Sequence, residues 1–176
     1  MLLLKALNSK VYFKKFINTS LFNYDELNVI FNQAKNLEQL NFRIINNNAS
    51  YAIPNDKLLE IKDENVTYIV EDAKDIKPTF KSFRDVFVEK FTDLRSSVNW
   101  DVHIFASRDK GESSFQPHKD KASNVIVQCE GTCRWTVDNQ TYELEQGDII
   151  YIPIGVEHHC VPLSRRLSLS FPFWFE

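Results

Sequence analysis

Cysteine is scarce in this chain, and the spacing of its cysteine residues matches neither a disulfide framework nor a zinc finger. The three residues, Cys129, Cys133 and Cys160, are an odd number without paired spacing. This argues against a disulfide scaffold and favours reduced thiols in a cytoplasmic protein. We expect Cys129 and Cys133 to lie on neighbouring strands as small core residues.

Positive charge is also limited. The net charge is −3, and the notable basic pairs are Lys14-Lys15 and Arg165-Arg166. Nucleic-acid binding by charge alone is therefore not expected. The apolar stretch at residues 1–7 is too short for a signal peptide or a membrane span, and the charged residue Lys5 interrupts it. We expect no membrane partner and a cytoplasmic location.

Apolar and aromatic residues are plentiful by contrast. Hydrophobic residues make up 43% of the 176 positions, and 14 of them are phenylalanines, which suffices for one domain with a substantial core. We expect a single domain over residues 1–176. Residues 1–97 would supply N-terminal strands and flanking helices, and residues 98–176 the core of a barrel.

The N-terminal half predicts two helices between short strands. A strand is expected at Val11–Phe16, and a helix capped by Asn23 or Asp25 should run to about Leu40. Further strands are expected at 42–45, 49–53 and 66–70. A second helix should run from about Thr79 to Leu94. Its apolar stripe should pack on the outside of a sheet; the stripe comprises Phe80, Phe83, Phe87, Phe91 and Leu94.

Short strands separated by turn residues follow one another in the C-terminal half. They are expected at 100–106, 124–129, 133–137, 141–144 and 148–152. Such spacing is typical of an antiparallel sandwich or barrel. The polar segment 107–114 precedes His118 and is a natural lid over the barrel mouth.

Three residues in this region have the chemistry of metal ligands. His118 and Asp120 are two apart, so an extended backbone directs both side chains to one face. His158 follows a later strand and can meet them across a barrel. Two imidazoles and one carboxylate on one side of an ion form the facial triad of non-haem Fe(II) oxygen-activating enzymes.

Each histidine could also have a structural role that requires no metal. A bare His-x-Asp is often a surface pair beside a turn, and only the surrounding strand pattern favours a metal site. His159 competes with His158 for the third position. We expect His103 to be a strand residue that a hydrogen bond satisfies.

The combined motifs resemble the cupin-like, Jumonji-C-type Fe(II)/2-oxoglutarate oxygenases, especially small bacterial members and ribosomal-oxygenase relatives. The resemblance covers about Trp100 to Phe173. It is carried by His118-x-Asp120, Gly147-Asp-Ile-Ile-Tyr-Ile-Pro153-x-Gly155-x-x-His158 and Ser168-Leu-Ser-Phe171. Small cupins carry His-x-His followed by Glu, and Asp120 departs from that pattern toward the oxygenase branch.

The resemblance implies a mainly β, double-stranded β-helix (jelly-roll) barrel with about two flanking helices. It also implies a hydroxylase that uses Fe(II) and the cosubstrate 2-oxoglutarate. The family spacing selects His158 over His159, so that His118, Asp120 and His158 are the implied catalytic metal ligands. The substrate would be a small molecule or a peptide or protein side chain, and the enzyme a monomer or homodimer.

One position departs from the family. Many relatives hold the distal carboxylate of 2-oxoglutarate with a Lys or Arg fifteen residues after the first ligand, and here that residue is Cys133. Arg134 should point to the other face. Arg166 is the alternative anchor, because Arg166, Ser168 and Ser170 alternate on one face and Arg suits a carboxylate; it could equally flank a solvated turn.

Ser168 and Asn124 are lesser cosubstrate candidates, and Tyr151 could donate a hydrogen bond into the cavity. Two other functions stay open. One is a cupin-type dioxygenase or other metalloenzyme that does not use 2-oxoglutarate, which Cys133 favours. The other is a non-catalytic cupin binding module, against which an intact ligand set counts.

Overall fold

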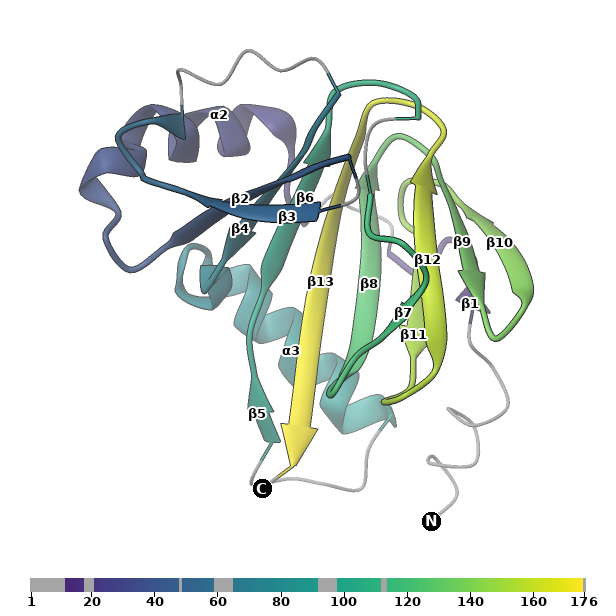
Figure 1. Cartoon of the computed structure of the whole chain (residues 1–176). Helices are drawn as coiled ribbons and strands as arrows, with labels where there is room; N and C mark the ends of the chain where they lie inside the picture. Colours follow the sequence, from purple (N-terminus) through teal and green to yellow (C-terminus); the bar gives the residue numbers. More distant parts are fainter. Residues whose placement is uncertain are drawn as a thin grey trace.

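Two antiparallel sheets face each other in the computed structural model (Figure 1). The structure describes residues 12–17, 21–47, 49–58, 65–91, 98–111 and 114–175. Strands dominate this part of the chain, as the sequence predicts, and the two sheets form a jelly roll of the cupin type.

The larger sheet has nine strands among the described residues. Its order is β1 (Tyr12–Phe13), β11 (Ile149–Ile152), β8 (Ser123–Glu130), β13 (Arg166–Phe175), β6 (His103–Ser107), β4 (Thr67–Glu71), β2 (Asn41–Asn46) and β3 (Ala49–Ile53), with β5 (Val98–Trp100) also paired to β13. The smaller sheet has the order β10 (Gln140–Leu144), β9 (Cys133–Val137), β12 (Glu157–Pro162) and β7 (His118–Lys119).

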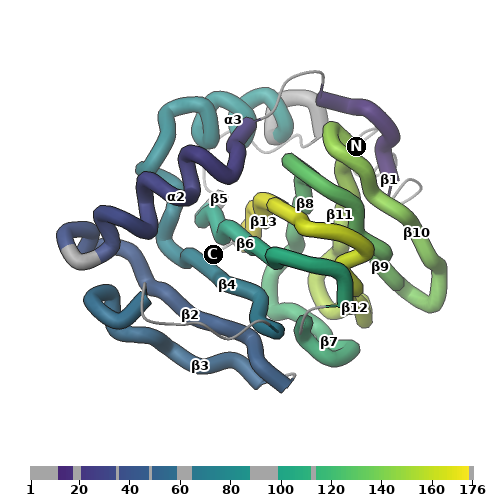
Figure 2. The backbone as a smooth tube through the Cα atoms, turned by 90° about the horizontal axis from the view of Figure 1, so that it is seen from above, coloured from purple at the N-terminus to yellow at the C-terminus, as the bar shows by residue number. Residues whose placement is uncertain are grey.

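Two helices, α2 (Tyr24–Gln33) and α3 (Pro78–Phe91), cover the outer face of the larger sheet in the described part of the chain (Figure 2). Phe80 is fully buried, and its ring lies edge-on to Phe171 of β13. Phe83 also contacts Phe171. The predicted stripe therefore packs on the sheet as expected, although the side chain of Phe91 and residue Leu94 lie outside the described residues.

Side chains of β8 alternate between two cores. Val125, Val127 and Cys129 face the helices, whereas Ile126 faces the smaller sheet. Alternation of this kind is what a strand between two layers requires. Cys129 and Cys133 were expected on neighbouring strands, and this expectation is wrong. They lie on consecutive strands that belong to different sheets, and each packs in a different core.

Several boundaries differ from the predicted ones: the strand predicted at 100–106 is divided into β5 and β6, and two differences lie in the N-terminal half. The first strand is only Tyr12–Phe13, because Lys15 turns to φ 48° and its backbone N–H donates to Asp148. The first helix begins as predicted, with Asn23 accepting from the backbone of Glu26.

This first helix ends at Gln33 instead of Leu40. A short 3-10 turn, Ala34–Asn36, follows it. The amide of Asn55 then donates to the carbonyl of Leu37 at 3.1 Å, which holds the segment after the turn in a non-helical course into β2.

The strands of the N-terminal half extend the larger sheet. Strand β4 pairs with β6, and β2 and β3 follow outward. These elements match the strands predicted near 42–45, 49–53 and 66–70, and Asn47 in the turn between β2 and β3 has a positive φ of 48°. No helix in the described part of the chain is long and apolar enough to cross a membrane.

Candidate metal centre

His118 and His158 lie directly opposite each other on β7 and β12. Their ring centroids are 4.4 Å apart. The turn before β12 fixes this register, because Gly155 at φ 76° donates its backbone N–H to the carbonyl of Asp120. The same hydrogen bond places Asp120, which directly follows β7, beside both imidazoles.

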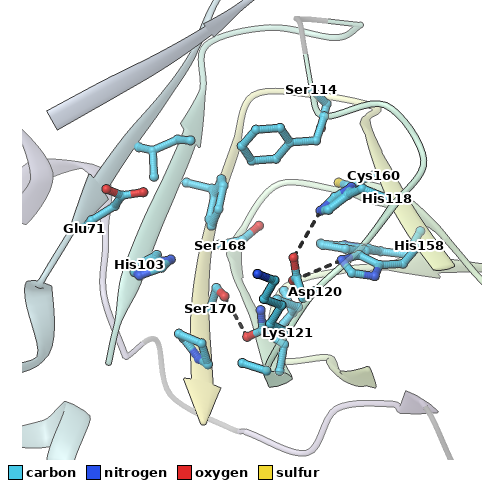
Figure 3. A pocket seen from close by; sticks show the side chains of 18 of the residues that line it. Glu71, His103, Ser114, His118, Asp120, Lys121, His158, Cys160, Ser168 and Ser170 are labelled. Carbon is cyan, nitrogen blue, oxygen red and sulfur yellow. Dashed lines mark hydrogen bonds and ion pairs between the residues drawn. The ribbon is translucent and has the colours of Figure 1, made fainter. Parts of the chain in front are cut away.

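The three predicted ligands converge. Asp120 Oδ1 lies 3.7 Å from His118 Nε2, and Asp120 Oδ2 lies 3.4 Å from His158 Nε2 (Figure 3). One potential donor atom from each residue falls within 4.8 Å of the other two. His158 is 4% exposed, so its imidazole lies in the barrel wall and not on the surface.

Both imidazoles are oriented by the backbone. His118 Nδ1 lies 2.8 Å from the carbonyl of Gln116, and His158 Nδ1 lies 2.9 Å from the carbonyl of Val156. A carbonyl oxygen only accepts, so Nδ1 carries the proton in each ring. In each ring Nε2 is then the nitrogen that faces Asp120. It donates a hydrogen bond when the ring is charged and offers a lone pair when the ring is neutral, and the neutral form is that of metal-bound histidines.

The charges of the cluster reinforce one another. A hydrogen bond from His158 holds the pKa of Asp120 below its ordinary value, and a hydrogen bond from the Asn124 amide acts in the same direction. Burial by itself lowers the pKa of His158, but the hydrogen bonds to Asp120 and the Val156 carbonyl raise it above its ordinary value. The carboxylate is therefore ionised and fits a divalent cation.

The other histidines are not part of this cluster. His103 Nε2 lies 3.2 Å from Asp101 Oδ2, which confirms the expected hydrogen-bonded strand residue. His159 pairs with Thr136 in the sheet, and strand alternation turns it away from the ligand face.

A cavity of about 640 Å³ opens beside the three ligands. In Figure 3, His118, Asp120 and His158 lie on one wall, Glu71 and His103 on the opposite wall, and Ser168 and Ser170 of β13 between them. The lining also includes Ile69, Phe105, Ser114, Phe115, Lys121, Ala122, Asn124, Ile126, Trp135, Cys160, Arg166, Pro172 and Trp174.

Arg166 lies in the wall of this cavity and is only 2% exposed. Its Nε donates to Ser107 Oγ at 3.0 Å, and its Nη1 donates to Cys160 Sγ at 2.8 Å and to Cys133 Sγ at 3.7 Å. In the part of the chain that the structure describes, no carboxylate pairs with this guanidinium and no hydrogen bond engages its Nη2. A buried cation without a carboxylate partner is costly unless an anion joins it.

The two sulfur atoms partly balance this charge. Burial alone raises the pKa of Cys133, but the hydrogen bond from Cys160 and the charge of Arg166 outweigh it and lower that pKa to about 6. Burial raises the pKa of Cys160, which keeps its proton. Although burial disfavours the charge of Arg166, the neighbouring sulfurs raise the pKa of its guanidinium.

Of the other predicted site residues, some line the cavity and some point away from it. Ser168 Oγ donates to Gln128 and Ser170 Oγ donates to Asn124, each at 2.7 Å, and Asn124, Ser168 and Ser170 line the cavity. Arg134 points outward, as expected, and pairs with Glu143 at 2.7 Å. Tyr151 does not reach the cavity; it stacks on Phe173 in the core beneath the helices.

Several cavity residues were missed from the sequence. Cys160 follows His158 by two positions on the same strand, so strand alternation could have placed it on the ligand face. Trp135 on β9 stacks on His158, with ring centroids 6.2 Å apart, and also lines the cavity. Ser107 meets Arg166 only through the pairing of β6 with β13, which no local signal reveals.

Residues 105–166 match the family model described as a cupin domain. This stretch, about a third of the chain, is similar to cupin domains. The match begins on β6 and ends at Arg166, so it includes the three ligands and both cysteines that contact the arginine.

Solved structures share this cupin fold. The ribosomal oxygenase YcfD from Escherichia coli superposes with a TM-score of 0.73 and 21% identity, over 94% of this chain and 48% of that chain. The same values hold for YcfD in complex with cobalt and 2-oxoglutarate. The jelly-roll fold that the sequence predicts is thus shared with a solved ribosomal oxygenase.

The chain spans about half the length of the ribosomal oxygenase it matches. No curated protein matches it by sequence.

Proposed function

We propose that the protein is a non-haem Fe(II)- and 2-oxoglutarate-dependent oxygenase that hydroxylates a small molecule or a peptide or protein side chain. One observation carries the proposal. The cavity that contains the His118, Asp120 and His158 donors also contains a buried guanidinium that pairs with no carboxylate of the described residues. A metal and a dicarboxylate would satisfy both features at once.

The three donors would hold the metal and leave its remaining positions toward the cavity. Asp120 supplies negative charge, and each imidazole is kept in its metal-binding tautomer by a backbone carbonyl. When bound, Fe(II) and 2-oxoglutarate together supply the activation of O₂ that such oxygenases use. The fold is shared with a protein solved with cobalt and 2-oxoglutarate, which supports this choice of cosubstrate.

Arg166 would bind the distal carboxylate through Nη2, while Ser107 and the two sulfurs hold the rest of the guanidinium in place. Ser168 and Asn124 line the same cavity and would contact the cosubstrate. Asn124 also contributes to the pKa of Asp120, so it would help to orient this metal ligand. The aromatic side chains Phe115 and Trp174 line the remaining space, where the substrate would bind.

The test is an anaerobic titration of the purified protein with Fe(II) and 2-oxoglutarate. We expect a visible metal-to-ligand charge-transfer band in the wild type and in the surface control Arg134→Ala. We expect the band to weaken strongly in Arg166→Ala and less in Arg166→Lys, which keeps the charge. Consumption of 2-oxoglutarate and formation of succinate under O₂ give the matching activity readout.

Cys133 supports a second candidate, because it stands where many relatives carry a basic residue. That candidate is a cupin-type dioxygenase or another metalloenzyme that does not use 2-oxoglutarate. Iron binding without the band, even at high 2-oxoglutarate, would favour it. Failure to bind any divalent metal would instead indicate a non-catalytic cupin binding module.

A further inference from the structure

Three buried side chains form one row across the larger sheet, at the place where Arg166 enters the cavity wall. Thr67 is the first residue of β4, Ser107 the last of β6 and Arg166 the first of β13, and strand pairing sets Ser107 directly beside the other two. All three residues are at most 2% exposed. Strand ends open more readily than strand centres, so contacts from outside the ladder decide how firmly Arg166 is held.

The hydroxyl groups of this row form a chain of hydrogen bonds to the guanidinium. Arg166 Nε donates to Ser107 Oγ at 3.0 Å, and Ser107 Oγ lies 2.7 Å from Thr67 Oγ1. Ser107 is fully buried, so bulk water cannot replace Thr67 as the partner of its hydroxyl. The Thr67 hydroxyl therefore orients the Ser107 hydroxyl, which in turn fixes the guanidinium at Nε.

Tyr24 of α2 contacts the main chain of the same row from the core beneath the helices. Its hydroxyl oxygen lies 2.7 Å from the carbonyl oxygens of both Ser107 and Arg166, so one hydroxyl bridges β6 and β13. The guanidinium carbon of Arg165 lies 3.6 Å from the centre of its ring, and its backbone N–H donates to Glu130 Oε1 of β8 at 3.0 Å. Tyr24 thus links α2 to the three strands around Arg166.

We propose that Tyr24 and Thr67 are positioning residues that hold the Arg166 guanidinium in the cavity wall. Thr67 acts through the Ser107 hydroxyl on the orientation of Nε. Tyr24 acts through the two carbonyl groups on the main chain from which the Arg166 side chain extends. Neither residue lines the cavity, so neither would touch the cosubstrate. A helix on the outer face of the sheet would thereby set the affinity of the cavity for an anion.

The inference rests on the proposed function in one respect, namely that Arg166 binds a dicarboxylate. Two readouts keep the two ideas apart. The first is the affinity of the full chain for 2-oxoglutarate, measured by calorimetry in the presence of cobalt. The second is the rate of hydrogen exchange at Arg166 Nε–H, measured by NMR without any ligand. The Arg166→Lys variant assigns this signal, because it removes the Nε–H group.

The variants remove single hydroxyl groups and keep the shapes of the side chains. We expect Tyr24→Phe and Thr67→Val each to weaken 2-oxoglutarate binding about 3- to 10-fold and to speed exchange at Arg166 Nε–H by a similar factor, as expected for one hydrogen bond. Thr67→Ser keeps the hydroxyl and should behave like the wild type. Tyr12→Phe is the matched control. Its lost hydroxyl donates to Asp148 at 2.8 Å on the edge strand β1, so both readouts should stay unchanged.

A double variant separates positioning from a general loss of stability. In the Arg166→Lys background, Thr67→Val should change the 2-oxoglutarate affinity by less than about 2-fold, because the Nε–H group on which Thr67 acts is gone. A merely structural role for Thr67 would lower the affinity equally in both backgrounds.

Two results would overturn the inference. One is an equal effect of Thr67→Val in both backgrounds. The other is unchanged 2-oxoglutarate affinity and unchanged Nε–H exchange in Tyr24→Phe and Thr67→Val, even where urea unfolding shows lower stability. If Tyr24→Phe does not fold, the comparison of Thr67→Val with Thr67→Ser still decides the test. A wild type that binds no 2-oxoglutarate would remove the proposed function, and the exchange rates at Arg166 Nε–H would then decide the positioning role alone.

Discussion

The Nη1 atom of Arg166 lies 3.7 Å from the sulfur of Cys133. A side chain from β13 thus lies beside the position at which many Jumonji-C-type oxygenases carry a basic residue. If the protein uses 2-oxoglutarate as proposed, Arg166 would take over the role of that residue from another strand.

Replacement of Arg166 should separate cosubstrate binding from metal binding. We expect Arg166→Lys to raise the KM for 2-oxoglutarate about 10- to 100-fold, since Lys loses the forked geometry that a carboxylate accepts. Cobalt affinity should change little, because Arg166 is not among the clustered donors. Steady-state kinetics and a cobalt titration measure the two effects, and an equal loss in both would contradict the assignment.

The cation proposed to bind the distal carboxylate of 2-oxoglutarate should also function from β9 instead of β13. Arg166→Ala removes the guanidinium, and Cys133→Lys in the same chain places an ammonium close to the vacated position. We expect the double variant to recover part of the 2-oxoglutarate affinity that Arg166→Ala loses. Calorimetric titration in the presence of cobalt measures the recovery. A double variant that binds no better than Arg166→Ala would show that the two positions do not serve one site.

Mutation should distinguish the three proposed metal ligands from the neighbouring His159. We expect His118→Ala, Asp120→Ala and His158→Ala each to weaken cobalt binding by more than about 100-fold, since even outer contacts of metal ligands cost 10- to 100-fold. His159→Ala is the matched control and should bind cobalt like the wild type. A loss in His159→Ala equal to that in His158→Ala would mean that the third ligand is misassigned.

Gly131 should be irreplaceable for a steric reason. It adopts φ 72°, and a Cβ there would lie 1.7 Å from the carbonyl oxygen of Arg165, the residue directly before Arg166. We expect Gly131→Ala to lower the free energy of unfolding by at least about 2 kcal/mol. Gly111 has φ 73°, and no atom of the described residues lies within 4 Å of a Cβ built there, so Gly111→Ala should cost only about 1 kcal/mol. Urea unfolding of both variants measures the difference.

The sequence predicted those parts of the structure that depend on local pattern. Alternating apolar residues located the strands, and the Asn23 cap located the start of the first helix. The pair His118 and Asp120 is local as well. His158 was found through a family spacing, and the structure places it opposite His118.

The sequence predictions were wrong where contacts between distant segments determine the structure. The first strand is short because Asp148, far along the chain, captures the backbone of Lys15. Cys129 and Cys133 were assigned to adjacent strands because the sequence shows their order but not the switch between sheets. The contact of Arg166 with Ser107 likewise depends on the register of β6 and β13.

We infer that three side chains bind one divalent cation: His118 on β7, Asp120 directly after β7, and His158 on β12. The most direct test is anomalous diffraction from crystals grown with cobalt under anaerobic conditions. We predict one strong peak at bonding distance, about 2.1 Å, from His118 Nε2, His158 Nε2 and an Asp120 oxygen. A fully occupied peak elsewhere, or none between these side chains at saturating cobalt, would contradict the account.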